Sequence, residues 1–262
     1  MAIYKTDYHI HTTFSDGRDT PEASIRAAVR MGFREIGFSD HLHPVGKPLD
    51  WYMNHDRLPE YCDEIIRLGK EHRDIAVRLG IEIDYIPGME KKTAEFIDAY
   101  PFDYVIGSVH YLGVETVDLG PEFYIGRDID MIYENYFNLV CEAASAGLFD
   151  IIGHPDLVRI HRFKPDKDIS FLYRMMAAAF DDHDVAFELN TNGRNKPIRD
   201  FYPDRKYLDI FEEHKVPVCV NSDAHFPERT GQYFDEAYEL LKRSGYREMA
   251  VFRNRERYLI PF

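Results

Sequence analysis

Cysteine and long apolar runs are scarce in this sequence of 262 residues, and each scarcity argues against a class of protein. The three cysteines, Cys62, Cys141 and Cys219, are odd in number and scattered. This favours reduced, mostly buried thiols over a disulfide framework or a Cys-x-x-Cys zinc site. No apolar run reaches the roughly 18 residues that a membrane-spanning helix needs. The first residues also lack the apolar core of a signal peptide, so we expect a cytoplasmic protein without a membrane partner.

Positive charge is also in short supply. The chain has 46 acidic and 32 basic residues, which gives a net charge of −14 at pH 7. Proteins that bind nucleic acid neutralise its phosphates with Lys and Arg, so this balance argues against such a partner. No basic stripe accompanies the many Tyr and Phe residues, as a base-stacking surface would require. An anionic small molecule would bind only where the site itself is locally positive.

The sequence does contain a regular alternation of short apolar runs and helical patterns. The expected strands lie near residues 3–9, 35–39, 76–83, 102–108, 149–152, 185–189 and 216–220, with a shorter apolar run at 249–252. The expected helices cover about 21–31, 57–73, 90–99, 128–146, 168–182, 204–214 and 231–244, the first of them with Thr20 as its N-cap and Pro21 in its first turn.

Apolar strands that alternate with helices indicate a parallel sheet covered on both faces. Seven such units, perhaps with an eighth strand, predict a TIM-like barrel that is distorted or incomplete. No linker divides the chain, so we expect a single domain over residues 1–262. A doubly wound sheet is the structural alternative, but no Gly-x-Gly-x-x-Gly turn supports it.

Ionisable side chains recur where the predicted strands end. His9 and His11 share one face of a strand, because side chains two residues apart point the same way. Asp16 follows in the next turn. The other candidates at or just after strand ends are His41, Glu82, His110, His154, Asp223 and His225. In TIM-like barrels the active site lies at the C-terminal ends of the strands, so we expect these side chains to converge there.

Imidazole and carboxylate ligands without thiolates suit zinc, manganese or iron. Six histidines and three carboxylates are too many for one ion, so we expect two or three divalent ions, with Glu82 or Asp223 bridging a pair. Each histidine alone has a structural alternative as a strand cap or core residue, but their recurrence favours metal ligation. The ions would make a positive well that attracts phosphate or carboxylate. Paired metals activate a bridging hydroxide for attack on phosphorus.

Two arginines follow strand-end clusters where a phosphate clamp would be useful. Arg159 and Arg194 are therefore candidate phosphate ligands, because guanidinium binds phosphate through two parallel hydrogen bonds. The alternative for each is a surface ion pair. His43 lies near the clusters, and Asp156 is placed to orient a ligand histidine.

The order and spacing of these motifs resemble the PHP (polymerase and histidinol phosphatase) superfamily over nearly the whole chain. The motifs are His9-x-His11 with Asp16, Asp40-His41, Gly80-Ile81-Glu82-Ile83-Asp84, Ser108-Val109-His110, Gly153-His154-Pro155-Asp156 and Ser222-Asp223-Ala224-His225. The resemblance implies a distorted (β/α)7 barrel with a trinuclear metal centre. It allocates one metal to His9, His11, Glu82 and Asp223, a second to Glu82, His110 and His154, and a third to Asp16, His41 and His225.

Finer features are similar to the PHP-type histidinol-phosphatases. They are the segments 81–88, 107–113 and 190–197, together with the chain length. The resemblance implies hydrolysis of L-histidinol phosphate in histidine biosynthesis. It makes Arg159 and Arg194 phosphate-binding residues. We also expect His43 to bind the substrate, and Asp223 or His225 to donate a proton to the leaving alkoxide. The alternatives are a PHP phosphoesterase for nucleotides or other small phosphates, a metal-dependent exonuclease and a non-catalytic metal-binding protein.

Overall fold

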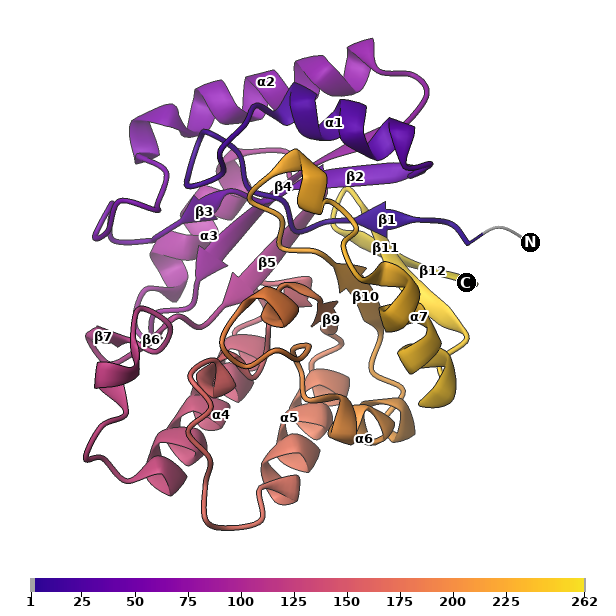
Figure 1. The fold of residues 1–262 in the computed structure, drawn as a ribbon. Helices are drawn as coiled ribbons and strands as arrows, with labels where there is room; N and C mark the ends of the chain where they lie inside the picture. The colour runs from indigo at the N-terminus through magenta and orange to yellow at the C-terminus, as the bar shows by residue number, and fades with distance from the viewer. Residues whose placement is uncertain (1–2, 262) are drawn as a thin grey trace.

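The computed structural model describes residues 3–261, whose central feature is a nearly closed barrel of parallel strands (Figure 1). The barrel strands, in spatial order, are β1 (Thr6–Asp7), β2 (Glu35–Phe38), β4 (Ala76–Asp84), β5 (Tyr104–Ser108), β8 (Ile151–Ile152), β9 (Ala186–Asn190) and β10 (Val218–Asn221). A further short strand, β3 (His41–Leu42), pairs in parallel with the end of β4 and sets His41 opposite Glu82. The predicted TIM-like barrel is confirmed.

The barrel closes through backbone that is not regular strand. Ile10 and Ala224 form an isolated parallel bridge. The His11 N–H donates to the Ala224 carbonyl at 2.9 Å, and the Ala224 N–H donates to the His9 carbonyl at 3.1 Å. The first and last barrel segments are therefore joined at the residues that the sequence proposes as metal ligands.

Seven α-helices connect and cover the strands within residues 3–261 (Figure 1). They are α1 (Pro21–Arg30), α2 (Leu58–Glu71), α3 (Glu90–Ala99), α4 (Ile129–Ser145), α5 (Ser170–Asp182), α6 (Leu208–Glu213) and α7 (Phe234–Arg243). Each coincides with a predicted helix to within a few residues. The Thr20 side chain accepts a hydrogen bond from the Ala23 N–H, as expected of an N-cap. No helix in the part of the chain that the structure describes combines the length and apolar character needed to span a bilayer.

Two strand predictions need correction, and one hairpin was not predicted. The first strand is only Thr6–Asp7, because the chain beyond it pairs with Ala224 across the closing seam. The run at 249–252 is not a barrel strand: β11 (Glu248–Arg253) pairs antiparallel with β12 (Glu256–Pro261). Asn254 and Arg255, with φ of 50° and 64°, make the tight turn between these strands. A second hairpin, β6 (Tyr111–Leu112) with β7 (Glu115–Thr116), was not predicted.

The N-terminal half of the barrel interior is filled by aromatic and aliphatic side chains. Tyr8, Tyr104, Ile106, Ile151, Ala186 and Cys219 from the barrel pack with Ala250 and Phe252 from β11. The Tyr104 ring fits only because Gly37 and Gly80 flank it: a Cβ on these glycines would lie 2.4 and 2.2 Å from Tyr104 atoms. The β11–β12 hairpin thus closes the end of the barrel opposite the candidate site. The three cysteines are free, and Cys62 and Cys219 are buried.

Candidate metal centre

The nine predicted ligands converge at the C-terminal end of the barrel. His9 and His11 lie on the closing segment after β1, Asp16 in the following turn, His41 on β3, Glu82 on β4, His110 after β5, His154 after β8, and Asp223 and His225 after β10. Their donor atoms fall into four overlapping groups, within each of which the atoms lie within 4.8 Å of one another. Parallel strands bring their carboxyl ends to one edge, so positions far apart in the sequence meet there.

Glu82 lies at the centre of the cluster. Its Oε2 is 2.7 Å from His41 Nδ1 and 3.1 Å from His9 Nε2. Its Oε1 is 3.1 Å from His154 Nε2 and accepts a hydrogen bond from Ser108 Oγ at 2.5 Å. Burial by itself would raise the pKa of Glu82, but His41, His9 and His154 outweigh it and hold that pKa well below its usual value. An ionised carboxylate with histidines on both oxygens has the geometry of a bridging ligand.

Asp223 is the second carboxylate that faces several rings. Its Oδ1 lies 3.3 Å from His11 Nε2, 3.9 Å from His9 Nε2 and 3.5 Å from His225 Nδ1. The backbone at Asp223 has a φ of 48°, and that at His154 has a φ of 24°. Residues other than glycine rarely adopt such left-handed backbone conformations. The exceptions concentrate at functional sites, where the surrounding structure imposes them.

Asp16 and His225 form the outer side of the cluster. Asp16 Oδ2 is 3.1 Å from His225 Nε2, and Asp16 Oδ1 is 3.8 Å from His11 Nδ1 and 3.9 Å from His41 Nε2. The side chains of Asp16 and His225 are 28% and 22% exposed, whereas those of His9 and His11 are fully buried. The cluster therefore opens to solvent on the Asp16 side, where a small molecule can enter.

The geometric groups agree with the allocation from the resemblance only in part. His11, Asp16, His41 and His225 form one group, and His9, His11 and Asp223 form another. His154 groups with His9 and Glu82, whereas His110 groups with His41 and Glu82. The resemblance instead allocates His110 and His154 together. In both the geometric grouping and the allocation from the resemblance, Glu82 belongs to two of the groups.

The cluster fits divalent metal ions because many of its polar atoms are otherwise unsatisfied. Buried atoms without a hydrogen bond inside residues 3–261 include His9 Nε2, both ring nitrogens of His11, His41 Nδ1 and Glu82 Oε2. Each unsatisfied buried polar atom costs roughly 1–3 kcal/mol. Burial, reinforced by His41 and His225, lowers the pKa of His11 to about 3, so this ring is neutral and has a free lone pair. Nitrogen and oxygen donors without sulfur suit catalytic zinc, manganese or iron.

Two supporting carboxylates were missed in the sequence. Glu188 Oε2 lies 2.8 Å from His9 Nδ1, and Glu188 Oε1 accepts from the His154 backbone N–H at 2.7 Å. Asp84 Oδ1 lies 2.9 Å from His110 Nδ1. Both fix a ring so that Nε2 points into the cluster, as supporting carboxylates do in metal sites. Strand periodicity held a signal for Asp84, which shares a face with Glu82 two residues earlier.

The prediction that Asp156 orients a ligand histidine is wrong. Its Oδ2 accepts from Arg159 at 2.9 Å, from the Tyr173 hydroxyl at 2.6 Å and from the Asp204 backbone N–H at 2.7 Å. The backbone turns at His154, so the carboxylate two residues later points toward α5 and not into the cluster. Asp156 therefore anchors Arg159 and the loop before α6.

The two candidate arginines lie outside the four ligand groups. Arg159 is buried and lies 3.1 Å from Asp204 Oδ2 in addition to its bond with Asp156. Arg194 follows β9, with its guanidinium 3.3 Å from Glu236 and stacked near the Phe201 and Tyr233 rings. Both are thus held in fixed positions by carboxylates, and their contact with substrate stays a prediction.

His43 lies beside the cluster in a neutral form. The Val45 N–H donates to His43 Nδ1 at 3.2 Å, so the ring proton is on Nε2. Burial lowers the pKa of His43, although Asp84 opposes the shift. Its ring packs against Tyr52 and Tyr111, with centroids 5.2 and 5.4 Å away. His43 is therefore a neutral hydrogen-bond donor at the mouth of the barrel.

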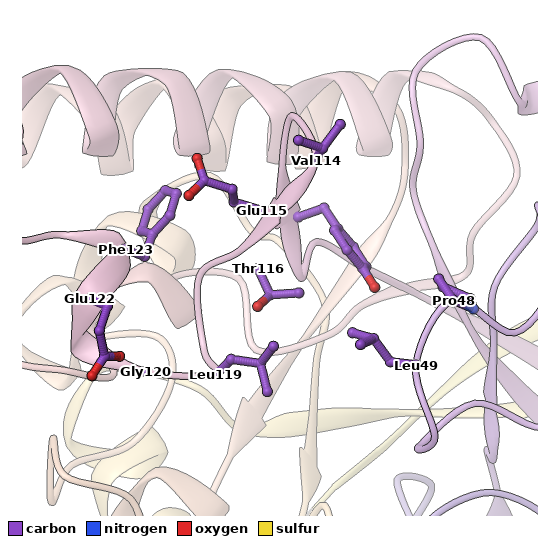
Figure 2. Close-up of a pocket in the computed structure, with 10 residues that line it drawn as sticks. Pro48, Leu49, Val114, Glu115, Thr116, Leu119, Gly120, Glu122 and Phe123 are labelled. Atoms are coloured by element: carbon purple, nitrogen blue, oxygen red, sulfur yellow. The ribbon is translucent and has the colours of Figure 1, made fainter.

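A cavity of about 460 Å³ is lined in part by Tyr111, the residue after the ligand His110. Figure 2 shows Pro48 and Leu49 on one side of it and the β6–β7 hairpin on the other. Its walls are mainly apolar, with Leu119 and Phe123 among them. The mouth of the barrel thus combines the polar cluster with an adjoining apolar surface.

Comparison with known proteins gives a consistent result. The PHP domain family model matches residues 7–192. The chain is 35% identical over 257 residues to a probable histidinol-phosphatase of Deinococcus radiodurans, covering 95% of this chain and 97% of the relative. It is 30% identical to the histidinol-phosphatase of Lactococcus lactis, covering 95% of this chain and 94% of the relative.

Among solved structures, the chain resembles the histidinol phosphate phosphatase of Lactococcus lactis in complex with zinc, L-histidinol and phosphate. The TM-score is 0.86 at 26% sequence identity, and the match covers 98% of this chain and 100% of that structure. The likeness therefore extends over the whole barrel and both hairpins.

Proposed function

The chain belongs to the PHP domain family, and from this premise we propose that it is a histidinol-phosphatase that hydrolyses L-histidinol phosphate to L-histidinol and phosphate. The observation that carries the proposal is the full-length likeness to an enzyme solved with zinc, L-histidinol and phosphate, in a chain that keeps a complete ligand cluster. The reaction belongs to histidine biosynthesis, and a cytoplasmic location follows from that role as a prediction.

In this proposal the nine clustered side chains hold two or three divalent ions of zinc, manganese or iron. When bound, such ions polarise phosphoryl oxygens and lower the pKa of a bound water. Glu82 is shared between neighbouring sites, because its two oxygens face different histidines. Glu188 and Asp84 keep His9 and His110 oriented.

The remaining residues bind the substrate and move a proton. Arg159 and Arg194 hold the phosphoryl oxygens, and Asp156 and Glu236 fix their guanidinium groups. His43 donates from Nε2 to the ester. Asp223 or His225 protonates the leaving alkoxide. His225 Nδ1 lies 3.1 Å from the Asp223 backbone oxygen and 3.5 Å from Asp223 Oδ1.

The net charge of −14 supports a small phosphate ester over nucleic acid, because the positive charge of the site is confined to the metal cluster and the two arginines. A PHP phosphoesterase for nucleotides or other small phosphates would use the same cluster. Only the selectivity of the enzyme separates that alternative from a histidinol-phosphatase.

The test is phosphate release by protein of measured metal content. L-histidinol phosphate is compared with AMP, sugar phosphates and an aryl phosphate, before and after removal of metal with a chelator. We expect kcat/KM for L-histidinol phosphate to exceed the others by at least about a hundredfold, which equals about 2.7 kcal/mol of transition-state discrimination. Activity should vanish with the metal and return with its addition. Flat activity across the panel would reject the histidinol-phosphatase assignment.

A further inference from the structure

A carboxylate at the barrel mouth has no role in the metal cluster as described so far. Asp118 follows β7, and its Oδ1 is buried without a hydrogen-bond partner among residues 3–261. Burying a carboxylate oxygen without a donor is unfavourable, so the loop must hold it there against that cost. An unpaired carboxylate at the edge of a ligand site is suited to binding a cation.

The backbone around Asp118 is anchored beside the cluster. The Val117 N–H donates to the His110 carbonyl at 2.9 Å, which brings the end of the β6–β7 hairpin back to the ligand His110. On the other side, His161 Nε2 lies 3.1 Å from the Asp118 carbonyl oxygen. Asp118 therefore directly follows a residue whose backbone is hydrogen-bonded to that of the ligand His110.

A second unsatisfied group approaches the same region from a different loop. Tyr202 is 1% exposed, and its hydroxyl has no hydrogen bond within the described residues. Its backbone is tied to the end of β9 by two hydrogen bonds with Asn190, at 2.7 and 3.0 Å. Its ring centroid lies 6.5 Å from that of His154. The Tyr202 hydroxyl is therefore a second buried polar group without a hydrogen bond, on a ring that lies beside the ligand His154.

We propose that Asp118 binds the protonated amino group of the substrate and is the residue that selects amino-alcohol phosphates from other phosphate esters. This inference rests on the proposed function, since L-histidinol phosphate has a primary amine on the carbon next to its phosphorylated CH₂. Such an amine is cationic at neutral pH. With the phosphate on the metal cluster, the ammonium would lie beside it, and the loop after β7, which returns to the ligand His110, carries the carboxylate that we assign to it.

The experiment compares Asp118→Asn with wild type on two pairs of substrates. The first pair is L-histidinol phosphate and the same ester without the amino group, and the second is ethanolamine phosphate and ethyl phosphate. Glu122→Gln is the matched control, because it removes one carboxylate from the same exposed loop region outside the cluster. Metal content and thermal unfolding are measured for each variant.

We expect Asp118→Asn to lower kcat/KM for the amine-bearing esters by about 10-fold to 100-fold, mainly through KM. The esters without the amine should change less than about twofold, and Glu122→Gln should leave all four unchanged. Equal losses on both members of a pair, or no loss on either, would overturn the inference. If wild type rejects L-histidinol phosphate but prefers ethanolamine phosphate over ethyl phosphate, and Asp118→Asn removes that preference, the proposed function fails while this inference stands.

Discussion

The two ends of the barrel are built from the same strands but have opposite chemistry. In β4, Gly80 makes room for an aromatic ring, and Glu82, two residues further on, lies at the centre of the ligand cluster. In β5, Tyr104 fills the N-terminal half of the barrel, whereas Ser108 hydrogen-bonds Glu82 at the other end. Each of these strands therefore contributes to core packing at its N-terminal end and to the candidate metal centre at its C-terminal end.

The ends differ most in how their polar groups are paired. At the N-terminal end, Glu35 accepts hydrogen bonds from the Tyr8 hydroxyl and from Arg78, the latter at 2.9 Å. Arg255, in the turn of the β11–β12 hairpin, pairs with Asp150. At the C-terminal end, ring nitrogens and a carboxylate oxygen are buried without hydrogen bonds. A barrel end whose carboxylates are paired with arginines contributes stability, whereas an end that buries several ring nitrogens and a carboxylate oxygen without hydrogen bonds is prepared for a ligand.

The largest contrast should come from two buried strand glutamates at opposite ends. Glu82→Gln is expected to lower kcat/KM by at least about a thousandfold and to reduce bound metal, because a neutral amide cannot bridge two cations. Glu35→Gln should leave kcat/KM of folded protein within about twofold but cost about 1.5–3 kcal/mol of stability. Phosphate release, metal analysis and denaturant unfolding measure these effects. Full activity with full metal content in Glu82→Gln would show that Glu82 is not a bridging ligand.

The aromatic end should be sensitive in stability alone. Phe252 is 2% exposed and packs on Tyr8 and Tyr104. Phe252→Ala is expected to lower the free energy of unfolding of metal-free protein by about 3–5 kcal/mol, with unchanged kcat/KM at temperatures where the protein is folded. Phe171→Ala serves as the control because Phe171 is 50% exposed on α5. A large loss of kcat/KM in folded Phe252→Ala would mean that the two ends are coupled.

Two arginines that pair with aspartates, one at each end of the barrel, test whether ion pairs also differ between the two ends in their effect on activity. Arg159→Met is expected to lower kcat/KM by about a hundredfold, whereas Arg255→Met at the opposite end should change it less than about twofold. Both should destabilise the protein, since each leaves a largely buried carboxylate without its arginine partner. Arg194→Met should resemble Arg159→Met in activity with little change in stability, because its side chain is 31% exposed. Stability loss without activity loss in Arg159→Met would assign this residue to structure alone.

A smaller effect is expected from the carboxylate behind His9. Glu188→Gln keeps the shape of the side chain but weakens its hydrogen bond to His9 Nδ1, so metal affinity should fall about 10-fold to 100-fold. Added metal should restore activity, and competition with a chelator measures the affinity. Asp150→Asn, at the N-terminal end, is the control and should leave metal affinity unchanged. Unaltered affinity in Glu188→Gln would show that the ring is oriented by packing alone.

Much of this arrangement follows from the sequence alone. The alternation of apolar runs and helices predicts the parallel barrel, and the recurrence of His, Asp and Glu at strand ends predicts which side chains meet. The physical reason is that the spacing of apolar side chains along the sequence distinguishes helices from strands. Parallel strands then bring their carboxyl ends to the same end of the barrel. The ligand positions at strand ends could therefore be named without knowledge of the loops that connect the strands.

Only the tertiary structure decided the partners of these ligands and the closure of the other end. Glu188 and His9 are 179 residues apart, and no local pattern relates them. The direction of Asp156, the return of Asp118 to His110 and the packing of the β11–β12 hairpin depend on how loops turn between elements. Local propensity determines the helices and strands, whereas contacts between distant segments depend on the packing of the whole chain.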